Sequence, residues 1–148
     1  MPTRRLALVA ALLAACSSSS TAVGGREEPA LLRLGEQVAR VDVPDAATLG
    51  TPLVVTVTTF GGGCVREAAR AEVVPLHATQ GGAAAVRLFN RHTGGEACTD
   101  DLRFIEHRVA VPVTSAGTLQ LRIEGAARGA ESNWQLAPWA ITRVVVVR

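Results

Sequence analysis

The residues of this chain best suited to chemistry gather in one short stretch. An imidazole, a thiol and three carboxylates follow one another there: His92, Glu96, Cys98, Asp100 and Asp101. With Cys98 reduced, a His-x-x-x-Glu-x-Cys arrangement offers imidazole nitrogen and soft thiolate, ligands that suit zinc and copper. Oxidation of Cys98 would remove the thiolate and leave an ordinary solvated acidic loop. We therefore expect no resident metal and no other cofactor. A small zinc- or copper-binding protein that uses the His92–Asp101 loop is the alternative function.

The sequence contains the residue types of a hydrolase triad but no motif that positions them. Ser115 or Ser132 would be the nucleophile, with His107 as the base and Asp100 as the orienting carboxylate. Neither serine lies in a Gly-x-Ser-x-Gly elbow. His107 alternates in phase with Val109, which favours a buried, hydrogen-bonded histidine over a catalytic one. We therefore assign no catalytic residue and expect a protein that is not an enzyme; a hydrolase or a hydrolase inhibitor is the least favoured function.

Glycines and tryptophans form two further motifs. Gly61-Gly62-Gly63 lacks the Gly-Lys-Ser/Thr ending of a phosphate-binding loop, and the chain contains no lysine. The three glycines indicate a sharp turn of the backbone instead. Trp134 and Trp139 lie close together in a chain with only 3% aromatic residues. They either cap one end of the fold or form an exposed binding surface, since tryptophan is common at interaction hot spots.

The N-terminus has the pattern of a targeting signal. Arg4 and Arg5 precede an uncharged apolar run at 6–13, which is too short to span a bilayer. The run ends in Leu13-Ala14-Ala15-Cys16, which resembles the lipobox of bacterial lipoproteins. An ordinary secretory signal that is cleaved nearby, with the cysteine there by coincidence, is the alternative.

The lipobox resemblance implies a lipid anchor. Residues 1–15 would be removed as a signal peptide, and Cys16 would carry a diacylglycerol on its sulfur and an acyl chain such as palmitate on its amine. Two or more chains give stable membrane attachment. The protein would then lie in the cell envelope, held to a membrane through Cys16. Ser17 implies the outer membrane in a diderm cell; otherwise the anchor lies in the outer face of the plasma membrane.

Removal of the signal changes the count of cysteines and charges. Three cysteines minus a lipidated Cys16 leave Cys64 and Cys98, an even pair in an oxidising compartment. The pair predicts a disulfide, with a thiol metal site or a redox couple as the alternative. All 15 basic residues are arginine, and without Arg4 and Arg5 the chain has 13 Arg against 13 Asp plus Glu. This balance, without a clustered basic stripe, predicts no nucleic-acid partner.

Beyond Glu36 the hydrophobic pattern has a period of two, which is typical of β-strands. The expected strands are 39–43, 53–58, 72–79, 83–89, 104–113, 119–124 and 140–147. The third and fourth form a hairpin around a short glycine loop. Serine and glycine are frequent in 17–25, so we expect 16–35 to be a flexible tether, with 30–34 left open between linker and helical turn. One helical turn is expected at 65–70.

Seven or so short strands predict an all-β fold, a single antiparallel β-sandwich over 36–148. The layout resembles the immunoglobulin-like domains of bacterial surface lipoproteins. Thr59–Cys64, Ala97-Cys98-Thr99 and His107 resemble an uncharacterised lipoprotein group that implies no functional residues. Antibody-type domains have a Trp between their two cysteines, which is missing here, so we expect the bridge to pin the rim. The sequence predicts a membrane-anchored, non-enzymatic binding or structural module whose partner, an envelope protein or a glycan, stays unidentified.

Overall fold

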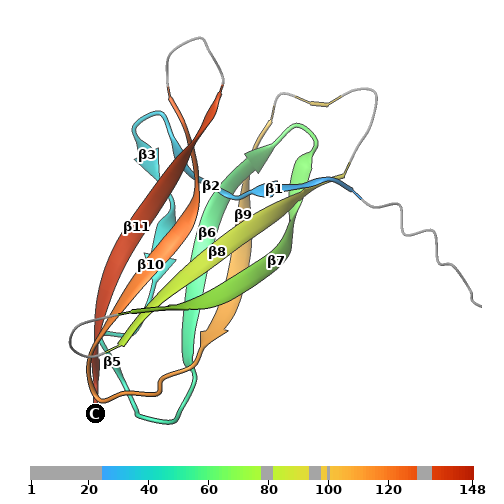
Figure 1. The fold of residues 1–148 in the computed structure, drawn as a ribbon. Coiled ribbons are helices and arrows are strands. Elements are labelled where there is room, and N and C mark those ends of the chain that lie inside the picture. Colours follow the sequence, from blue (N-terminus) through green and yellow to red (C-terminus); the bar gives the residue numbers. More distant parts are fainter. Residues whose placement is uncertain (1–24, 78–81, 94–97, 100, 130–134) are drawn as a thin grey trace, which may run out of the picture.

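A computed structural model describes residues 25–77, 82–93, 98–99, 101–129 and 135–148, and this part of the chain is all-β (Figure 1). None of these residues forms a helix that could cross a membrane. Five strands are short: β1 (Glu27–Pro29), β2 (Leu31–Leu34), β3 (Gln37–Val38), β4 (Arg40–Asp42) and β5 (Ala46–Ala47). Six are long: β6 (Leu53–Gly62), β7 (Val65–Leu76), β8 (Gly82–His92), β9 (Leu102–Val111), β10 (Gly117–Arg128) and β11 (Leu136–Val147).

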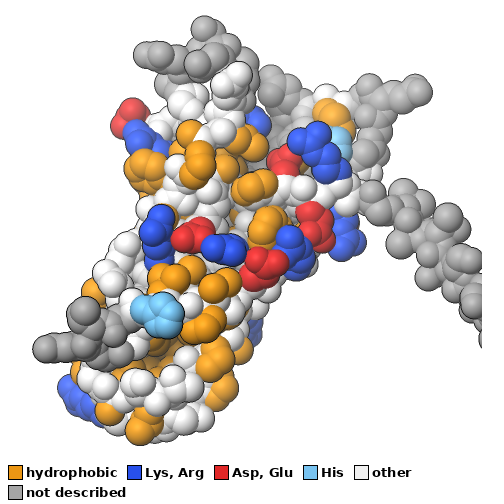
Figure 2. All heavy atoms as spheres, viewed as in Figure 1, with side chains coloured by type: hydrophobic (Ala, Val, Ile, Leu, Met, Phe, Trp, Pro, Cys, Tyr) orange, Lys and Arg blue, Asp and Glu red, His pale blue; other side chains and the backbone are white. Residues whose placement is uncertain are grey.

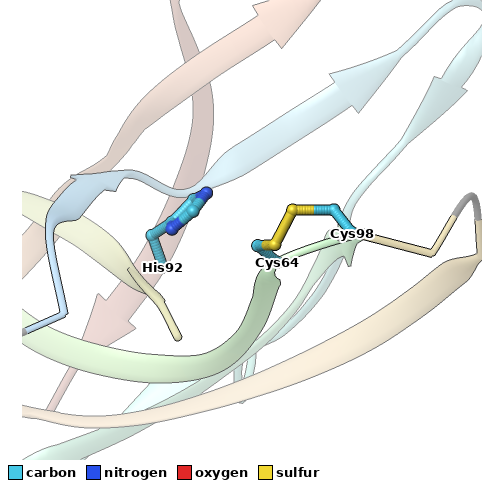
Figure 3. A group of neighbouring side chains, drawn as sticks. All are labelled: Cys64, His92 and Cys98. Atoms are coloured by element: carbon cyan, nitrogen blue, oxygen red, sulfur yellow. A yellow bond between two sulfur atoms is a disulfide. The ribbon is translucent and has the colours of Figure 1, made fainter. Parts of the chain in front are cut away.

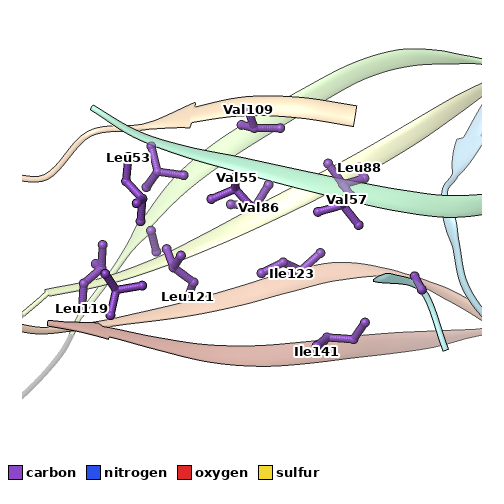
Figure 4. Packing of buried hydrophobic residues seen from close by; sticks show 14 of the residues in the cluster. Leu53, Val55, Val57, Val86, Leu88, Val109, Leu119, Leu121, Ile123 and Ile141 are labelled. Atoms are coloured by element: carbon purple, nitrogen blue, oxygen red, sulfur yellow. The ribbon is translucent and has the colours of Figure 1, made fainter. Parts of the chain in front are cut away.

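The alternation of apolar and polar residues becomes the two faces of the long strands. In β6, Leu53, Val55 and Val57 are buried, while the residues between them are exposed or half-buried. β10 shows the same alternation, with Leu119, Leu121 and Ile123 buried and the residues between them exposed. Successive side chains of a strand point to opposite faces, so one face of each strand enters the core. Figure 4 shows these side chains meeting between the strands. The prediction of an all-β protein is confirmed.

The strands pair most extensively in two groups. β6 pairs antiparallel with β9 along its whole length and with β4 on its other side. β7, β8, β10 and β11 form the second group, with β1 beside β8 and β5 beside β11. β2 contacts both groups, since it pairs with β10 and with Phe60 of β6. These pairings close a ring, β2–β6–β7–β8–β10, in which β6 joins β7 only through the pair Gly62↔Val65.

The expectation of antiparallel pairing was wrong at β2 with β10, at β5 with β11, and at β8 with β10. The longest of these parallel pairings joins β8 and β10 over Leu119↔Gly82 to Glu124↔Arg87. The cause of that pairing is the position of β9. After β8 the chain crosses to pair with β6 and then returns beside β8 in the same direction. A parallel pair needs such a crossover connection, which is more often a helix. Here the connection contains a strand, β9, that belongs to the opposite group.

The expectation of a flexible tether over 16–35 was wrong in part, because Glu27–Pro29 and Leu31–Leu34 form β1 and β2. Ala30 and Leu32 are fully buried, and the Ala30 N–H donates to Leu88 O at 2.8 Å. Ala30 O in turn accepts from the Ala126 N–H at 2.9 Å. The folded domain therefore includes β1 and β2, which precede the boundary of 36 that the sequence predicts.

Strand lengths differ from the predictions at several ends. The expected helical turn at 65–70 is the first half of β7, which pairs with β8 across two register shifts. The predicted hairpin is confirmed in β7 and β8, both longer than expected. β10 continues to Arg128, beyond the predicted end at 124, and β11 begins at Leu136, ahead of the predicted start at 140. The long strands bring the C-terminal ends of β6, β8 and β10 and the N-terminal end of β9 to one end of the molecule (Figure 1).

Candidate functional site

The triple glycine makes the turn between β6 and β7 and lets another segment pack against it. Gly62 and Gly63 have φ angles of 150° and 59°, values that residues with a side chain rarely adopt. A Cβ on Gly62 would collide with Asp101 O, and one on Gly63 would lie 3.4 Å from Cys98 Cβ. The glycines thus form a sharp turn, as predicted, and leave room for the chain around Cys98.

A disulfide joins Cys64 to Cys98, the pair that the cysteine count predicts. Their Cα atoms lie 5.0 Å apart, within the usual range for a bridge. Cys64 is 7% exposed, whereas Cys98 is on the surface. The bridge therefore pins the rim of the fold, as expected, and does not cross its core. Cys16, the predicted lipid site, lies outside the described residues.

His92 lies beside this disulfide. It is the last residue of β8 and pairs with Val65, the first residue of β7. The Thr93 N–H and hydroxyl both donate to Cys64 O, at 2.7 and 3.0 Å. The ligand atoms of Cys64, His92 and Cys98 all lie within 4.8 Å of one another. Figure 3 shows the imidazole next to the bridge.

The acidic residues of the expected metal loop do not join this group among the described residues. Glu96 and Asp100 lie outside them. The Asp101 carboxylate accepts from Thr99 Oγ1 at 2.6 Å and from Arg103 Nε at 2.7 Å. These two contacts hold the pKa of Asp101 far below its usual range. The structure therefore places His92 near Cys98 and Cys64, but the disulfide holds both sulfurs, so the thiolate that the metal alternative requires is absent while the bridge is closed.

Arg66 connects the Asp101 carboxylate to the turn formed by the three glycines. Arg66 Nε donates to Gly63 O at 2.7 Å, and Arg66 Nη2 lies 3.6 Å from the Asp101 carboxylate. The segment that carries Cys98 is thus held by ion pairs and hydrogen bonds as well as by the disulfide.

His107 is buried and hydrogen-bonded, as its phase in the strand predicts. It is 4% exposed, and its Nε2 lies 2.8 Å from Asn90 Oδ1. The Asn90 amide nitrogen donates to Phe60 O at 3.4 Å, which turns Oδ1 toward the ring; the ring nitrogen must therefore donate. Burial lowers the pKa of His107.

The hydrolase arrangement is not assembled in the described residues. His107 faces Asn90 in the interior, and Ser115 follows β9 beyond the end of that strand. Asp100 and Ser132 lie outside the described residues.

A surface hollow of about 440 Å³ adjoins the disulfide. Its apolar wall comes from Pro29, Leu31, Leu34, Phe60, Leu102 and Leu136, and Glu28, Asp101 and Arg128 add charges of both signs. Cys98 and the three glycines also line it. Ligand pockets usually have this size and this mixture of apolar wall and few polar groups. The hollow had no signal in the sequence, because its lining comes from strands far apart along the chain.

Trp139 lies next to the hollow, on the predicted binding surface. It packs against the core and is half-buried, with the Arg33 guanidinium 4.9 Å from the ring centroid. Leu136 and Arg128 line both its surroundings and the hollow. Trp139 therefore acts largely as a cap on this end of the fold. Trp134 lies outside the described residues.

No protein-family model matches this chain, and neither does any curated protein or solved structure. The function must be inferred from the residues and their geometry.

Charges of alternating sign cross one face of the molecule (Figure 2). Glu124 on β10 accepts from Arg87 at 2.9 Å and lies 3.2 Å from Arg122 Nε. Arg70 on β7 pairs with Glu27 of β1 at 2.6 Å and also with Glu72. Exposed ion pairs of this kind contribute little stability. These ion pairs join neighbouring strands, and their positive and negative charges are equal in number. We therefore interpret this surface as an ordinary solvent-exposed face.

Proposed function

We propose that this protein is a lipid-anchored lipoprotein of the bacterial cell envelope and acts as a non-enzymatic binding or structural module. The observation that carries the proposal is the Leu13-Ala14-Ala15-Cys16 motif directly ahead of a folded β domain. Only residues 17–24 separate Cys16 from the first described residue, Gly25. Such a spacing attaches the domain closely to the membrane.

The anchor fixes which end of the domain meets the membrane. Arg26 O accepts from the His92 N–H at 2.8 Å, so the chain reaches the domain beside the disulfide. Glu28 and Pro29 then line the hollow. A flexible chain of about ten residues spans roughly 16–19 Å. The end with the disulfide and the hollow therefore faces the bilayer, and the partner that we propose is an envelope protein or glycan at the membrane surface.

Within the all-β class, the immunoglobulin-like sandwich remains our proposal for the fold. It is supported by the two strand groups, β4–β6–β9 and β7–β8–β10–β11. The ring that connects them depends on sparse junctions, including the single pairs Gly62↔Val65 and Leu31↔Phe60. A sandwich has this division, because its two sheets meet through side chains more than through backbone pairing.

The anchor is tested by membrane fractionation of cells that express the full chain. We expect the Cys16→Ser variant to move from the membrane fraction to the soluble fraction. The matched control is the double variant Cys64→Ser/Cys98→Ser, which removes the other two thiols and should stay with the membrane. Retention of Cys16→Ser in the membrane would overturn the anchor.

The orientation is tested by site-specific cross-linking in intact envelopes. A photo-reactive residue in place of Leu136 labels the hollow. One in place of Ser115 labels a second hollow, of about 540 Å³, at the opposite end. We expect the Leu136 position to cross-link lipid or a membrane-surface component. Cross-links to such components from the Ser115 position alone would contradict the proposed orientation.

A second candidate function, metal binding, is favoured by one specific observation. The Sγ atoms of Cys64 and Cys98 and an imidazole nitrogen of His92 lie within 4.8 Å of one another, and reduction of the bridge would free both sulfurs as ligands. His92 and Cys98 belong to the loop that the sequence singles out.

A further inference from the structure

We infer that the Cys64–Cys98 disulfide masks a zinc site: its reduction frees two thiolates that bind one Zn²⁺ together with the His92 imidazole. The inference deepens the metal-binding candidate above and rests on it, and it is independent of the lipid anchor. It replaces the acidic loop residues with a Cys₂His ligand set.

The three ligand atoms are close to the separations that zinc requires. Zn–S bonds of about 2.3 Å and Zn–N bonds of about 2.0 Å place tetrahedral ligand atoms about 3.5–3.8 Å apart. The three atoms here lie within 4.8 Å of one another. Sulfurs in a disulfide are about 2.05 Å apart. After reduction they must therefore move apart by less than about 2 Å to reach the separation that zinc requires. Rotation of the two cysteine side chains, whose Cα atoms are 5.0 Å apart, covers this change.

Contacts other than the disulfide keep the ligands in register. Val65↔His92 is a strand pair, and two hydrogen bonds from Thr93 end on Cys64 O. These contacts hold Cys64 and His92 side by side whatever the state of the bridge. On the Cys98 side, Arg66 donates to Gly63 O and to the Thr99 hydroxyl. The third ligand therefore stays near the other two when the covalent bond opens.

Opening of the disulfide requires a two-electron reductant. A dithiol reductant transfers two electrons and two protons to the bridge, which becomes two thiols, and the reductant becomes a disulfide. Zinc then displaces one proton from each thiol, while the neutral imidazole binds through a ring lone pair. Two thiolates neutralise the charge of Zn²⁺. Three protein ligands leave the fourth position to water, as in catalytic zinc sites.

The ion can reach this site. Cys98 is exposed and His92 is half-buried, while only Cys64 is buried. Thiolate and imidazole suit zinc, and harder ions such as Mg²⁺ and Ca²⁺ prefer oxygen ligands. The site is therefore selective for a borderline-soft ion and open only in the reduced protein.

The test uses the full chain with Cys16→Ser, so that only two thiols remain. Zn²⁺ is titrated into the oxidised and the chemically reduced protein against a chromophoric chelator, and circular dichroism follows the strand signal. We expect one zinc per reduced chain and none per oxidised chain. His92→Ala should weaken zinc binding at least tenfold, since even the loss of a residue that supports a ligand has that effect.

His77→Ala is the matched control. His77 is exposed and follows the far end of β7, roughly 35 Å along the strand from Val65. This variant should bind zinc like the parent. If His92→Ala binds equally well, two thiols alone hold the metal and the inference is wrong. If the oxidised chain binds zinc as well as the reduced chain does, the inference is also wrong, because the metal site must then lie away from the disulfide.

Unfolding on reduction does not obscure the result. A reduced chain that loses its strand signal must regain it when zinc is added, because the folded state alone brings the three ligands together. Failure to bind zinc, in a folded or an unfolded reduced chain, would overturn the inference. The anchor proposal would be unaffected, since membrane fractionation tests it separately.

Discussion

Replacement of Leu32 by alanine tests where the folded domain begins. The sequence places Leu32 in a tether, whereas the structure places it on β2, fully buried in the core between β6 and β10. The packing around it is close: a Cβ built on Gly125 would lie 2.8 Å from Leu32 Cγ. A tether residue and a core residue differ sharply in what their truncation costs.

The expected loss of stability follows from this burial. Leu→Ala removes the equivalent of about three methylene groups, each worth about 0.8 kcal/mol when buried. The cavity left behind adds to this, because surrounding side chains relax only partly, and measured Leu→Ala losses reach about 3–5 kcal/mol. We expect a decrease of about 3–4 kcal/mol in the free energy of unfolding. That is a large part of the roughly 5–15 kcal/mol that stabilises a typical domain.

Urea unfolding, followed by tryptophan fluorescence, measures this loss. With a slope of about 2 kcal/mol/M, the midpoint should fall by about 1.5–2 M without a change in slope. Val38→Ala is the control, since Val38 is 51% exposed on neighbouring β3. Surface changes of this kind usually stay within about 0.5 kcal/mol. A Leu32→Ala loss as small as that of the control would refute the burial of β2 and restore the longer tether.

Three further predictions concern the bridge, the buried histidine and the glycine turn. The double variant Cys64→Ala/Cys98→Ala should lose about 3–4 kcal/mol in chemical unfolding, because the bridge closes a loop of 34 residues in sequence separation; a loss near zero would contradict a native disulfide. Burial lowers the pKa of His107 from 6.5, so its contribution to stability should be complete above pH 6.5 and fall as the pH drops below that value. As the pH falls, the imidazole of the unfolded chain takes up a proton before that of the folded chain, which favours unfolding. Urea midpoints at pH 7.5 and 5.5 should therefore fall more for the parent than for the His107→Gln variant. Equal pH dependence of the two midpoints would contradict this contribution of His107. Gly62→Ala should lower the thermal midpoint, because φ is 150° and the added Cβ meets Asp101 O; an unchanged midpoint would show that the turn tolerates a side chain.

Local patterns in the sequence predict the parts of the fold that local physics determines. The alternation in β6, β9 and β10 identifies these strands, since the period of two follows from strand geometry. The phase of His107 within β9 predicts its burial for the same reason. The count of cysteines predicts the bridge, because only one pairing remains once Cys16 is assigned to lipid.

Other features depend on contacts that no local pattern records. β1 and β2 have three and four residues, too few to show a period. Residues 65–70 contain Arg, Glu and Ala, which favour helices in isolation, but pairing with β8 makes them a strand. The parallel pairing of β8 with β10 depends on where β9 lies, which periodicity does not indicate.

The approach of His92 to Cys64 could not be predicted from the hairpin. The predicted strands 72–79 and 83–89 place Thr79 opposite Ala83, and that register, continued, would place Arg70 opposite His92. The structure instead pairs Val65 with His92, across two register shifts that periodicity does not indicate. The hollow beside the disulfide had no signal in the sequence either.

The parallel alignment of β8 with β10 has a consequence for how the chain acquires its structure. β10 pairs with β8 across the intervening β9, which itself pairs with β6, so both pairings join segments that are distant in sequence. Proteins dominated by such distant contacts fold slowly, in milliseconds to seconds, and expose unpaired strand edges meanwhile. We therefore expect the newly synthesised chain to be sensitive to proteases and prone to aggregation until these pairings have formed.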